Sequence, residues 1–288
     1  MLTATCLLGG EGITDRVTRG HDADRFVELG SLSKVMTGTI LMGLAGRGVT
    51  GLDTPLEDCL AEVPPGTGIT LRHLAEHTSG LPRLPPGDTG PADDPYLDFT
   101  EAALGVLLRD LERVVTARPG ATEYSNLGYA VLGRALTAVS GCTYQQLVDA
   151  YVLEPLGLPP GAATAVPPAD RRLVARTLFG RPRAIWTLTG PMLPSGGLWS
   201  TPRTMAAILV GLLVERRLGP PAPTWQRGNA SLWHNGATRA ASAVAVAHDD
   251  GRWLLLHRLN GDPARTDRMA FEAFAASEPP AAGQSVRR

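Results

Sequence analysis

The chain has 288 residues, 43% of them hydrophobic and 19% charged, with a formal net charge of -1 at pH 7. A chain of this length can bury a large core, either as one large domain or as two closely joined ones. The balanced charge leaves no basic excess to neutralise phosphates, which excludes nucleic acid as an expected partner.

The N-terminal half is predicted to begin with strands and to continue as helices. Residues 2–8 and 14–19 are expected to form two short strands around a GGEG turn. A helix is expected from Ser31 to about Arg47, because its apolar residues recur at helical spacing. Further helices are predicted in LDTPLEDCL, ITLRHLAEHTSGLP (capped by Thr70), FTEAALGVLLRDLE, LGYAVLGRALTAVSG (closed by Gly141) and TYQQLVDAYVLEPLGL (ended before Pro155).

Loops separate these helices from a second group of strands. Residues 84–98 and 158–198 are rich in proline and are expected to be loops, the first of them mobile. STPRTMAAILVGLLVERRLG is predicted to be a helix and GPPAPTWQRGN a linker. LWHNGAT, ASAVAVAHDDG and RWLLLHRLN are predicted strands, and RTDRMAFEAFAASE is a final helix.

Strands therefore gather at both ends of the chain and helices occupy the middle. We predict an α+β fold, in which one antiparallel sheet is built from both termini, is flanked by helices and is interrupted by an all-helical region. The sheet subdomain is assigned to residues 1–45 and 190–278, and the mainly helical subdomain to residues 46–189. Residues 279–288 are expected to be a disordered tail.

The cysteines and the N-terminus bear on the cellular compartment. Cys6, Cys59 and Cys142 are far apart and odd in number, which predicts free thiols in a reducing compartment. The first residues lack the basic region and long apolar run of a secretory signal. The longest apolar stretch, VMTGTILMGLAG, is too short to span a membrane. Unless a leader has been removed, these features predict a cytoplasmic protein with no membrane partner.

The first candidate site is the tetrapeptide Ser31-Leu32-Ser33-Lys34. Residues three apart share a helix face, so Ser31 and Lys34 can meet. Ser31 would also lie at the positive end of the helix dipole. A serine hydroxyl becomes a nucleophile when a base takes its proton, and a partly desolvated lysine can serve as that base. A solvated first turn is the simpler interpretation of this tetrapeptide taken by itself.

Two later segments supply companions for this pair. Tyr124 and Asn126 lie at the boundary between a turn and a helix, where a tyrosine can act as acid or base and an asparagine can position lysine or substrate. Trp233-His234-Asn235-Gly236-Ala237 opens a strand. Gly236 permits close approach of a substrate, and the backbone N–H of Ala237 can pair with that of Ser31 as an oxyanion hole.

In this order, SLSK, YSN and HNGA resemble the three motifs of the serine β-lactamase and penicillin-binding protein superfamily. The resemblance is closest to its class C branch, which includes class C β-lactamases, DD-peptidases, esterases and acyltransferases. FVELGSLSKVMTG, ITLRHLAEHTSGLP and PSGGLWSTP are also similar to this family, so the resemblance covers about residues 20–275. It implies a β-lactamase/transpeptidase-like fold.

The resemblance also implies roles for the site residues. Ser31 would be the acylated nucleophile, Lys34 its proton acceptor and Tyr124 the acid/base partner. Asn126 would position substrate, together with the strand residues Asn235, Gly236 and Ala237. His234 would stand where many relatives have a lysine, and would contribute a donor or a partial positive charge. Because a histidine is at best partly charged, neutral esters or amides are favoured over penicillins.

Three functions follow from these patterns. The first is a serine hydrolase acting through an acyl-serine on an ester, amide or lactam. The second is an acyltransferase passing the acyl group to an amine or alcohol in a natural-product pathway such as antibiotic biosynthesis. The third is a catalytically silent binding module. The expected partners are a small acyl substrate and an amine or alcohol acceptor, and the oligomeric state stays open.

No cofactor or metal is predicted. His73 and His77 lie at the i, i+4 spacing of a zinc pair, but no third ligand is evident and the resemblance places them in a structural segment. Glu28 and Glu123 flank the motifs, where surface and supporting roles cannot be told apart.

Overall fold

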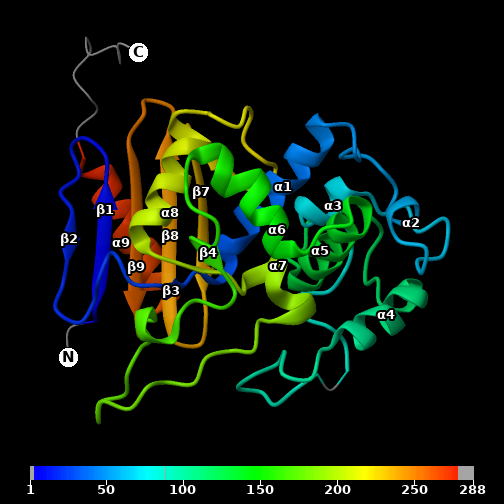
Figure 1. Ribbon diagram of the computed structural model, residues 1–288, viewed down its shortest axis with the longest axis horizontal. Coiled ribbons are helices and arrows are strands. Elements are labelled where there is room, and N and C mark those ends of the chain that lie inside the picture. Colours follow the sequence, from blue (N-terminus) through cyan, green and yellow to red (C-terminus); the bar gives the residue numbers. More distant parts are fainter. Residues whose placement is uncertain (1–2, 88, 278–288) are drawn as a thin grey trace.

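The main sheet joins the two ends of the chain. A computed structural model describes residues 3–87 and 89–277, and within these residues a six-stranded antiparallel sheet has the order β2-β1-β9-β8-β7-β6 (Figure 1). Its strands are β1 (Thr5–Gly9), β2 (Arg16–Val17), β6 (Gln226–Gly228), β7 (Ser231–Ala237), β8 (Ala241–His248) and β9 (Trp253–Leu259). Cys6 is paired with His257, so the N-terminal strand closes against the C-terminal hairpin. The predicted α+β fold with a sheet built from both termini is confirmed.

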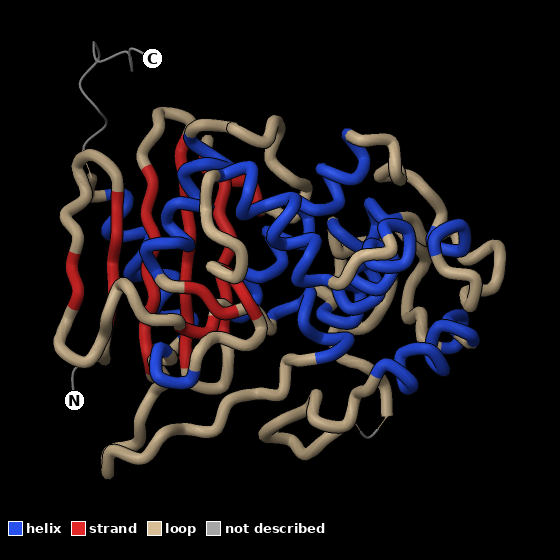
Figure 2. Tube along the Cα trace, in the orientation of Figure 1, coloured by secondary structure: helices blue, strands red, loops and turns tan. Residues whose placement is uncertain are grey.

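Helices fill the middle of the chain and lie to the right of the sheet in Figures 1 and 2. The α-helices are α1 (Ser33–Gly46), α2 (Leu56–Cys59), α3 (Leu71–Ala75), α4 (Glu101–Arg109), α5 (Asn126–Ser140), α6 (Tyr144–Val148), α7 (Leu193–Gly196), α8 (Pro202–Leu209) and α9 (Pro263–Ala275). Short 3₁₀ turns are η1 (Gly30–Leu32), η2 (Leu111–Arg113), η4 (Glu154–Leu156), η5 (Ala169–Arg171) and η6 (Gly190–Met192), and π-helical turns are η3 (Asp149–Leu153) and η7 (Val210–Val214). The predicted subdomain boundaries stay a prediction, and the predicted tail 279–288 lies outside the described residues.

Both faces of the main sheet are covered. Along β8, Val244 and Val246 pack with Phe274 on the α9 side, whereas Ala243 and Ala245 belong to the core that the sheet shares with α1 and α8. In Figure 1, α8 lies in front of the sheet and α9 behind it. Because side chains alternate along a strand, the small alanines lie on one face only, where they let α1 and α8 approach the sheet closely. This face brings the start of α1 up to β7.

Three very short strands, β4, β5 and β6, were not predicted from the sequence. A second sheet has the order β3-β5-β4 within the described residues, with β3 (Val27–Glu28), β4 (Ala163–Thr164) and β5 (Trp199–Ser200). Strands of two residues are too short to show a period, so segment 158–198 was expected to be loop throughout. Likewise β6 forms inside the predicted linker GPPAPTWQRGN, where pairing with β7 supplies the backbone partners that the local sequence does not indicate.

Helix ends confirm the predicted caps and correct one boundary. Thr70 caps α3, and Gly141 ends α5 in the left-handed conformation with φ 68. The helix predicted to end before Pro155 instead continues through the turns η3 and η4 to Leu156. Proline is tolerated there because it occupies the first turn of η4, where its missing N–H needs no partner.

The proline-rich loops are tied to each other. Trp186 Nε1 donates to the carbonyl of Asp93 at 2.9 Å, and Thr187 Oγ1 donates to the Asp94 carboxylate at 2.7 Å. These bonds join the later part of loop 84–98 to loop 158–198, two of the long tan segments in Figure 2. The described part of the loop that was predicted to be mobile is therefore held against a second segment.

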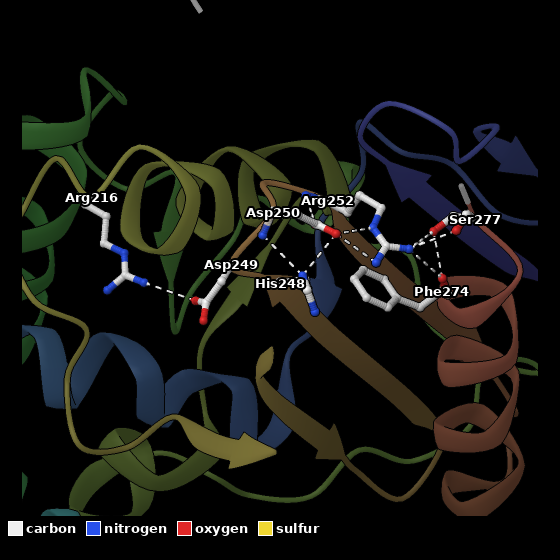
Figure 3. A network of polar contacts seen from close by, with 7 residues as sticks. All are labelled: Arg216, His248, Asp249, Asp250, Arg252, Phe274 and Ser277. Carbon is white, nitrogen blue, oxygen red and sulfur yellow. Dashed lines mark hydrogen bonds and ion pairs between the residues drawn. The ribbon is translucent and has the colours of Figure 1, made fainter. Parts of the chain in front are cut away.

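The turn between β8 and β9 is fastened to the end of α9 (Figure 3). Arg252 donates to the Asp250 carboxylate at 2.8 Å and to the carbonyl of Ser277 at 2.8 Å, and its guanidinium lies 5.0 Å over the Phe274 ring. His248 Nδ1 lies 3.1 Å from Asp250. An arginine that bonds two segments and stacks on an aromatic ring holds the C-terminal helix against the sheet.

No helix within residues 3–87 and 89–277 is both long enough and apolar enough to cross a bilayer. The three cysteines carry free thiols, as predicted. Cys6 is buried, and burial raises the pKa of its thiol to about 12, whereas Cys59 and Cys142 are half-buried.

Two buried histidines link strands β9 and β3 to the segment between β2 and β3. His21 Nε2 lies 2.9 Å from His257 Nδ1, and His257 Nε2 lies 3.1 Å from the carbonyl of Glu28. The carbonyl can only accept, so His257 donates through Nε2 and accepts from His21 at Nδ1. Burial lowers the pKa of His21 to about 4 and that of His257 to about 3, and it raises the pKa of Glu28 to about 7.

This pair predicts that stability falls in acid. Both histidines are neutral when folded but charge near pH 6.5 when unfolded, so the unfolded state binds more protons and stability is lost as the pH falls below 6.5 towards 4. Glu28 acts in the opposite sense, because its contribution is lost as the pH rises from 4.5 to 7. We expect His257→Gln to reduce the slope of unfolding free energy against pH by about 1.4 kcal/mol per pH unit between pH 5 and 6. Urea denaturation at several pH values measures this slope, and an unchanged slope in His257→Gln would contradict the assignment.

Candidate active site

Ser31 and Lys34 meet on the turn that leads from β3 into α1. Ser31 lies in the 3₁₀ turn η1 and Lys34 in the first turn of α1, and Lys34 Nζ is 3.1 Å from Ser31 Oγ. The predicted meeting of the two side chains is found, but Ser31 stands on a 3₁₀ turn rather than on the α-helix itself. Gly30, with φ +54, makes the sharp turn that presents Ser31.

Lys34 is fully buried, and it is the only lysine of the chain. Besides Ser31 Oγ, its Nζ contacts Asn126 Oδ1 at 2.8 Å and the carbonyl of Ser195 at 2.5 Å. Burial lowers the pKa of Lys34 well below its usual value, and the charge of Arg83 lowers it further. The two oxygens can only accept, so a neutral amine donates both its hydrogens to them and turns its lone pair towards Ser31.

Tyr124 approaches Ser31 from the other side. Its hydroxyl donates to Ser31 Oγ at 2.6 Å, across 93 residues of sequence. Burial raises the pKa of Tyr124, which keeps the phenol protonated at neutral pH. Ser31 Oγ therefore lies within hydrogen-bond distance of both the Tyr124 phenol and the Lys34 amine.

Asn126 orients Lys34 from the first turn of α5. Its Nδ2 donates to Tyr96 Oη at 2.9 Å, which leaves Oδ1 to accept from Lys34 and fixes the orientation of the amide. Ser125 caps α5 and also donates to the carbonyl of Pro82 at 2.7 Å. Two residues of the second motif therefore hold different parts of the site. Asn126 holds Lys34, and Ser125 holds the segment that follows α3.

Strand β7 packs directly against the turn η1, which carries Ser31. A Cβ on Gly236 would collide with the carbonyl oxygen of Leu29 and lie 3.1 Å from Ser31 N. A Cβ on Gly30 would lie 2.9 Å from Ala237 N. Real Cβ atoms do not come so close to backbone atoms, so Gly30 and Gly236 must both be glycine. This close approach of β7 to η1 brings the backbone N–H groups of Ser31 and Ala237 near each other.

The N–H of Ala237 faces this turn rather than the neighbouring strand. Thr238 N donates to the carbonyl of Ala241 at 2.9 Å, which closes the β7–β8 hairpin. In an antiparallel ladder the bonded residues alternate, so Ala237 directs its N–H to the other edge of β7. Pairing with β6 reaches only as far along β7 as Trp233, and η1 lies beyond it. The N–H of Ala237 is therefore directed towards η1, and its role in an oxyanion hole stays a prediction.

His234 and Asn235 differ from their predicted roles. His234 is buried, its Nδ1 donates to the carbonyl of Asn235 at 2.7 Å, and burial lowers its pKa to about 4. The ring is neutral at pH 7, so the expected partial positive charge is wrong. Asn235 donates to Asp267 of α9 at 2.9 Å, because alternation along β7 turns it to the opposite face from His234. The side chain predicted to bind substrate therefore lies away from Ser31.

Sequence reasoning missed several contributors to the site. They come from loops or act through backbone atoms: Tyr96, which bonds to Asn126; Ser195, whose carbonyl accepts from Lys34; and His77, which stacks on Tyr124 with ring centroids 4.3 Å apart. A contact made by a backbone carbonyl cannot be predicted from the residue type, because every residue has one. PSGG stands out in the sequence only as part of the resemblance, and Tyr96 is the sole aromatic residue of the loop 84–98, which was predicted to be mobile.

The histidine pair noted on the sequence has other partners. His73 accepts from the N–H of Thr70 at 3.2 Å, and His77 accepts from the N–H of Ser125 at 3.0 Å. Burial lowers the pKa of His77 to about 3. Among residues 3–87 and 89–277, no group of three or more His, Cys, Asp or Glu side chains is placed to hold a metal ion.

The single lysine allows its ionisation to be measured directly. Labelling with [13Cε]lysine should give one side-chain signal, and we expect it to titrate well below pH 10.5 because the folded protein desolvates the ammonium. Titration near 10.5 would show that Lys34 is charged at neutral pH and would contradict its assignment as a neutral base. Unfolding in urea should return the signal to the ordinary range.

Comparisons with known sequences place the chain in a family. The family model described as Beta-lactamase matches residues 7–279. D-alanyl-D-alanine-carboxypeptidase/endopeptidase AmpH of Escherichia coli is 34% identical over 187 residues, which are 63% of this chain and 47% of that protein. Putative beta-lactamase-like 1 of Homo sapiens is 32% identical over 199 residues, 64% of this chain and 38% of that protein. The chain thus spans about half the length of the curated relatives it matches, or less.

Solved structures share the fold over nearly the whole chain. A beta-lactamase/D-alanine carboxypeptidase from Yersinia pestis has a TM-score of 0.75 at 21% identity, covering 95% of this chain and 92% of that one. A class C beta-lactamase from Rhodobacter sphaeroides has a TM-score of 0.76 at 18% identity, covering 94% and 93%. The resemblance seen in the motifs is confirmed. With its fold, its three motifs and a family match along almost its full length, the chain belongs to the Beta-lactamase family.

Proposed function

We propose that this protein is a serine hydrolase that acylates Ser31 and then releases the acyl group to water. One observation carries the proposal: Ser31 Oγ lies 2.6 Å from the Tyr124 hydroxyl and 3.1 Å from Lys34 Nζ. A nucleophile held between an acid and a neutral base can lose its proton on one side while the leaving group gains one on the other.

In acylation, the lone pair of Lys34 takes the hydroxyl proton and Ser31 Oγ attacks the substrate carbonyl. The backbone N–H groups of Ser31 and Ala237 stabilise the oxyanion. As the bond to the leaving group breaks, the leaving atom takes the proton of Tyr124. The acyl-enzyme then contains an ammonium at Lys34 and a phenolate at Tyr124, which stabilise each other at close range.

Deacylation reverses these roles. The Tyr124 phenolate takes a proton from water, and the resulting hydroxide attacks the acyl carbon. When the tetrahedral intermediate collapses, Ser31 Oγ leaves and takes back its proton from Lys34. Both groups return to their starting states, so the cycle needs no further base.

The reacting group is an ester, an amide or a lactam. The family and the names of the relatives, which are carboxypeptidases and β-lactamases, support peptide and β-lactam substrates. The neutral ring of His234 favours substrates that need no cation at that position.

Trapping tests the proposal. The protein is incubated with a fluorophosphonate, with a fluorescent penicillin and with 4-nitrophenyl acetate, and intact mass followed by peptide mapping locates any adduct. We expect an adduct on Ser31 with at least one probe. No adduct with any of them would contradict the proposal and favour a silent binding module.

Product analysis separates hydrolysis from acyl transfer. Turnover of an ester in the presence of primary amines and alcohols is followed by chromatography. Hydrolysis predicts that the free acid dominates at millimolar acceptor, whereas a transferase would give mainly the amide or ester of one acceptor.

Tyr124→Phe should lower kcat/KM most for poor leaving groups. The variant keeps the ring that stacks on His77 but removes the proton donor. For an alkyl ester we expect a loss of about 10²- to 10⁴-fold, because general acid catalysis contributes that much. For a 4-nitrophenyl ester, whose leaving group needs no proton, the loss should be much smaller. Equal losses for both esters would show that Tyr124 is not the acid.

A further inference from the structure

A tight turn in the segment between β4 and α7 projects from the body of the protein. In Figures 1 and 2 this segment extends to the lower left, beyond the helices and strands. Leu178 and Phe179 lie in the turn and are 77% and 91% exposed, which makes them the two most exposed large hydrophobic side chains among the described residues. Most protein surfaces expose such side chains singly, so an adjacent pair on a projection indicates contact with a partner.

The turn closes on itself through its own hydrogen bonds. Thr177 N donates to the carbonyl of Arg181 at 2.8 Å, and Gly180 N donates to the carbonyl of Thr177 at 3.0 Å. Arg176 Nη1 donates to the carbonyl of Gly180 at 2.7 Å. Backbone groups that are already paired cost less to remove from water, so the turn can carry its two apolar side chains into a less polar environment.

The base of the turn is fixed to the main sheet. Ala175 is buried and packs with Ala241 of β8 and Leu259 of β9. Asn260, directly after β9, donates through Nδ2 to the carbonyl of Arg176 at 3.0 Å. The turn is therefore anchored to the body of the protein, and a contact made at its tip holds the whole molecule.

The same segment is strongly basic. Residues 165–190 contain five arginines and one acidic residue, Asp170, whereas the whole chain has a formal net charge of -1. Arg176, Arg181 and Arg183 flank the tip and are exposed, and none of the ion pairs between described residues involves them. A partner that complements this turn has an apolar region bordered by negative charge.

We propose that this turn docks the protein on an anionic lipid bilayer. Leu178 and Phe179 enter the headgroup region, and the flanking arginines meet the lipid phosphates. Leucine and aromatic side chains are favoured at the membrane interface, and arginine lies there with its apolar stem buried and its charge at the headgroups. The inference concerns a surface that the proposed hydrolase reaction does not use.

The size and shape of the turn favour a bilayer over a protein partner. A stable protein interface buries about 1,000 Å² or more, and two side chains on a narrow projection bury far less. A bilayer needs no complementary pocket, and its negative surface attracts the arginines. The expectation of no membrane partner rested on the lack of a spanning segment, and a turn that lies at the membrane surface needs none.

Sedimentation with sucrose-loaded vesicles tests the proposal. Vesicles of phosphatidylcholine alone are compared with vesicles of equal parts phosphatidylcholine and phosphatidylglycerol. We expect the full chain to partition onto the anionic vesicles about tenfold more strongly at low salt, and added salt should weaken this binding. Phe179→Ser should weaken it about tenfold because it removes the larger apolar side chain. Arg181→Gln and Arg183→Gln should each weaken it about five-fold.

Matched controls come from α4, which lies on the opposite side of Figure 1 from the turn. Val106→Ser removes a side chain that is 61% exposed, and Arg109→Gln removes an exposed arginine, so neither should change the partition coefficient. Brominated lipids locate the contact, because they quench tryptophan fluorescence only at short range. We expect them to quench the tryptophan added by Phe179→Trp and not the one added by Val106→Trp.

Three results would overturn the proposal. The first is that wild type does not sediment with anionic vesicles at low salt. The second is that Phe179→Ser binds them as strongly as Val106→Ser does. The third is that wild type dimerises in analytical ultracentrifugation and Phe179→Ser does not, because a second copy would then cover the tip. Ser31→Ala should bind the vesicles like wild type, so failure of the proposed hydrolase and failure of the membrane contact are separate outcomes.

Discussion

Ser31→Ala is expected to abolish the acyl-enzyme and to lower kcat/KM for esters by about 10⁴-fold or more. The reason is that Ser31 Oγ is the atom to which both Tyr124 and Lys34 bond, so its removal leaves an acid and a base with no nucleophile between them. Steady-state kinetics and intact mass after fluorophosphonate treatment measure the two effects. Residual rate should come only from the oxyanion hole and binding.

A matched control is Ser140→Ala. The hydroxyl of Ser140 bonds to the carbonyl of Leu136 at 2.7 Å within α5, so its loss should leave kcat/KM and probe labelling close to wild type. Thermal unfolding should show that Ser31→Ala is folded. A Ser31→Ala protein that still forms a covalent adduct would place the nucleophile elsewhere.

Lys34→Met is expected to lower kcat/KM by about 10²- to 10⁴-fold without unfolding the protein. Methionine has a similar unbranched and flexible side chain, so it can fill the space of the lysine without leaving a large cavity. It removes the lone pair that takes the Ser31 proton and leaves the acceptors Asn126 Oδ1 and the Ser195 carbonyl without that donor. We therefore expect a lower melting temperature as well, from about 1–3 kcal/mol for each unsatisfied acceptor.

The pH profile distinguishes lost catalysis from lost structure in this variant. Wild-type kcat/KM should rise with pH as Lys34 loses its proton, following the titration of its single 13Cε signal. Lys34→Met should lose this limb while Tyr124→Phe keeps it. If Lys34→Met kept the same acid limb and most of the rate, another group would be the base.

The sequence allowed much of the fold to be predicted where its signals are local. Helix caps such as Thr70 and Gly141 act within a few residues, and the periods along helices and long strands are read directly from the chain. The strands β4, β5 and β6 were missed because segments of two or three residues have no period and form only when a partner is present. The boundary at Pro155 was wrong because a 3₁₀ turn accepts proline where a continuing α-helix does not.

In the candidate site too, some features could be predicted from the sequence and others depend on the tertiary structure. The spacing of Ser31 and Lys34 determined that they share a face, and the order of the three motifs determined the family, because both depend only on neighbours along the chain. Tertiary structure alone decided that Tyr124 lies on Ser31, that a carbonyl 161 residues away holds Lys34, and that His234 is neutral. The physical reason is that ionisation depends on burial and on partners from distant segments, and a residue's own neighbours in the sequence do not determine either.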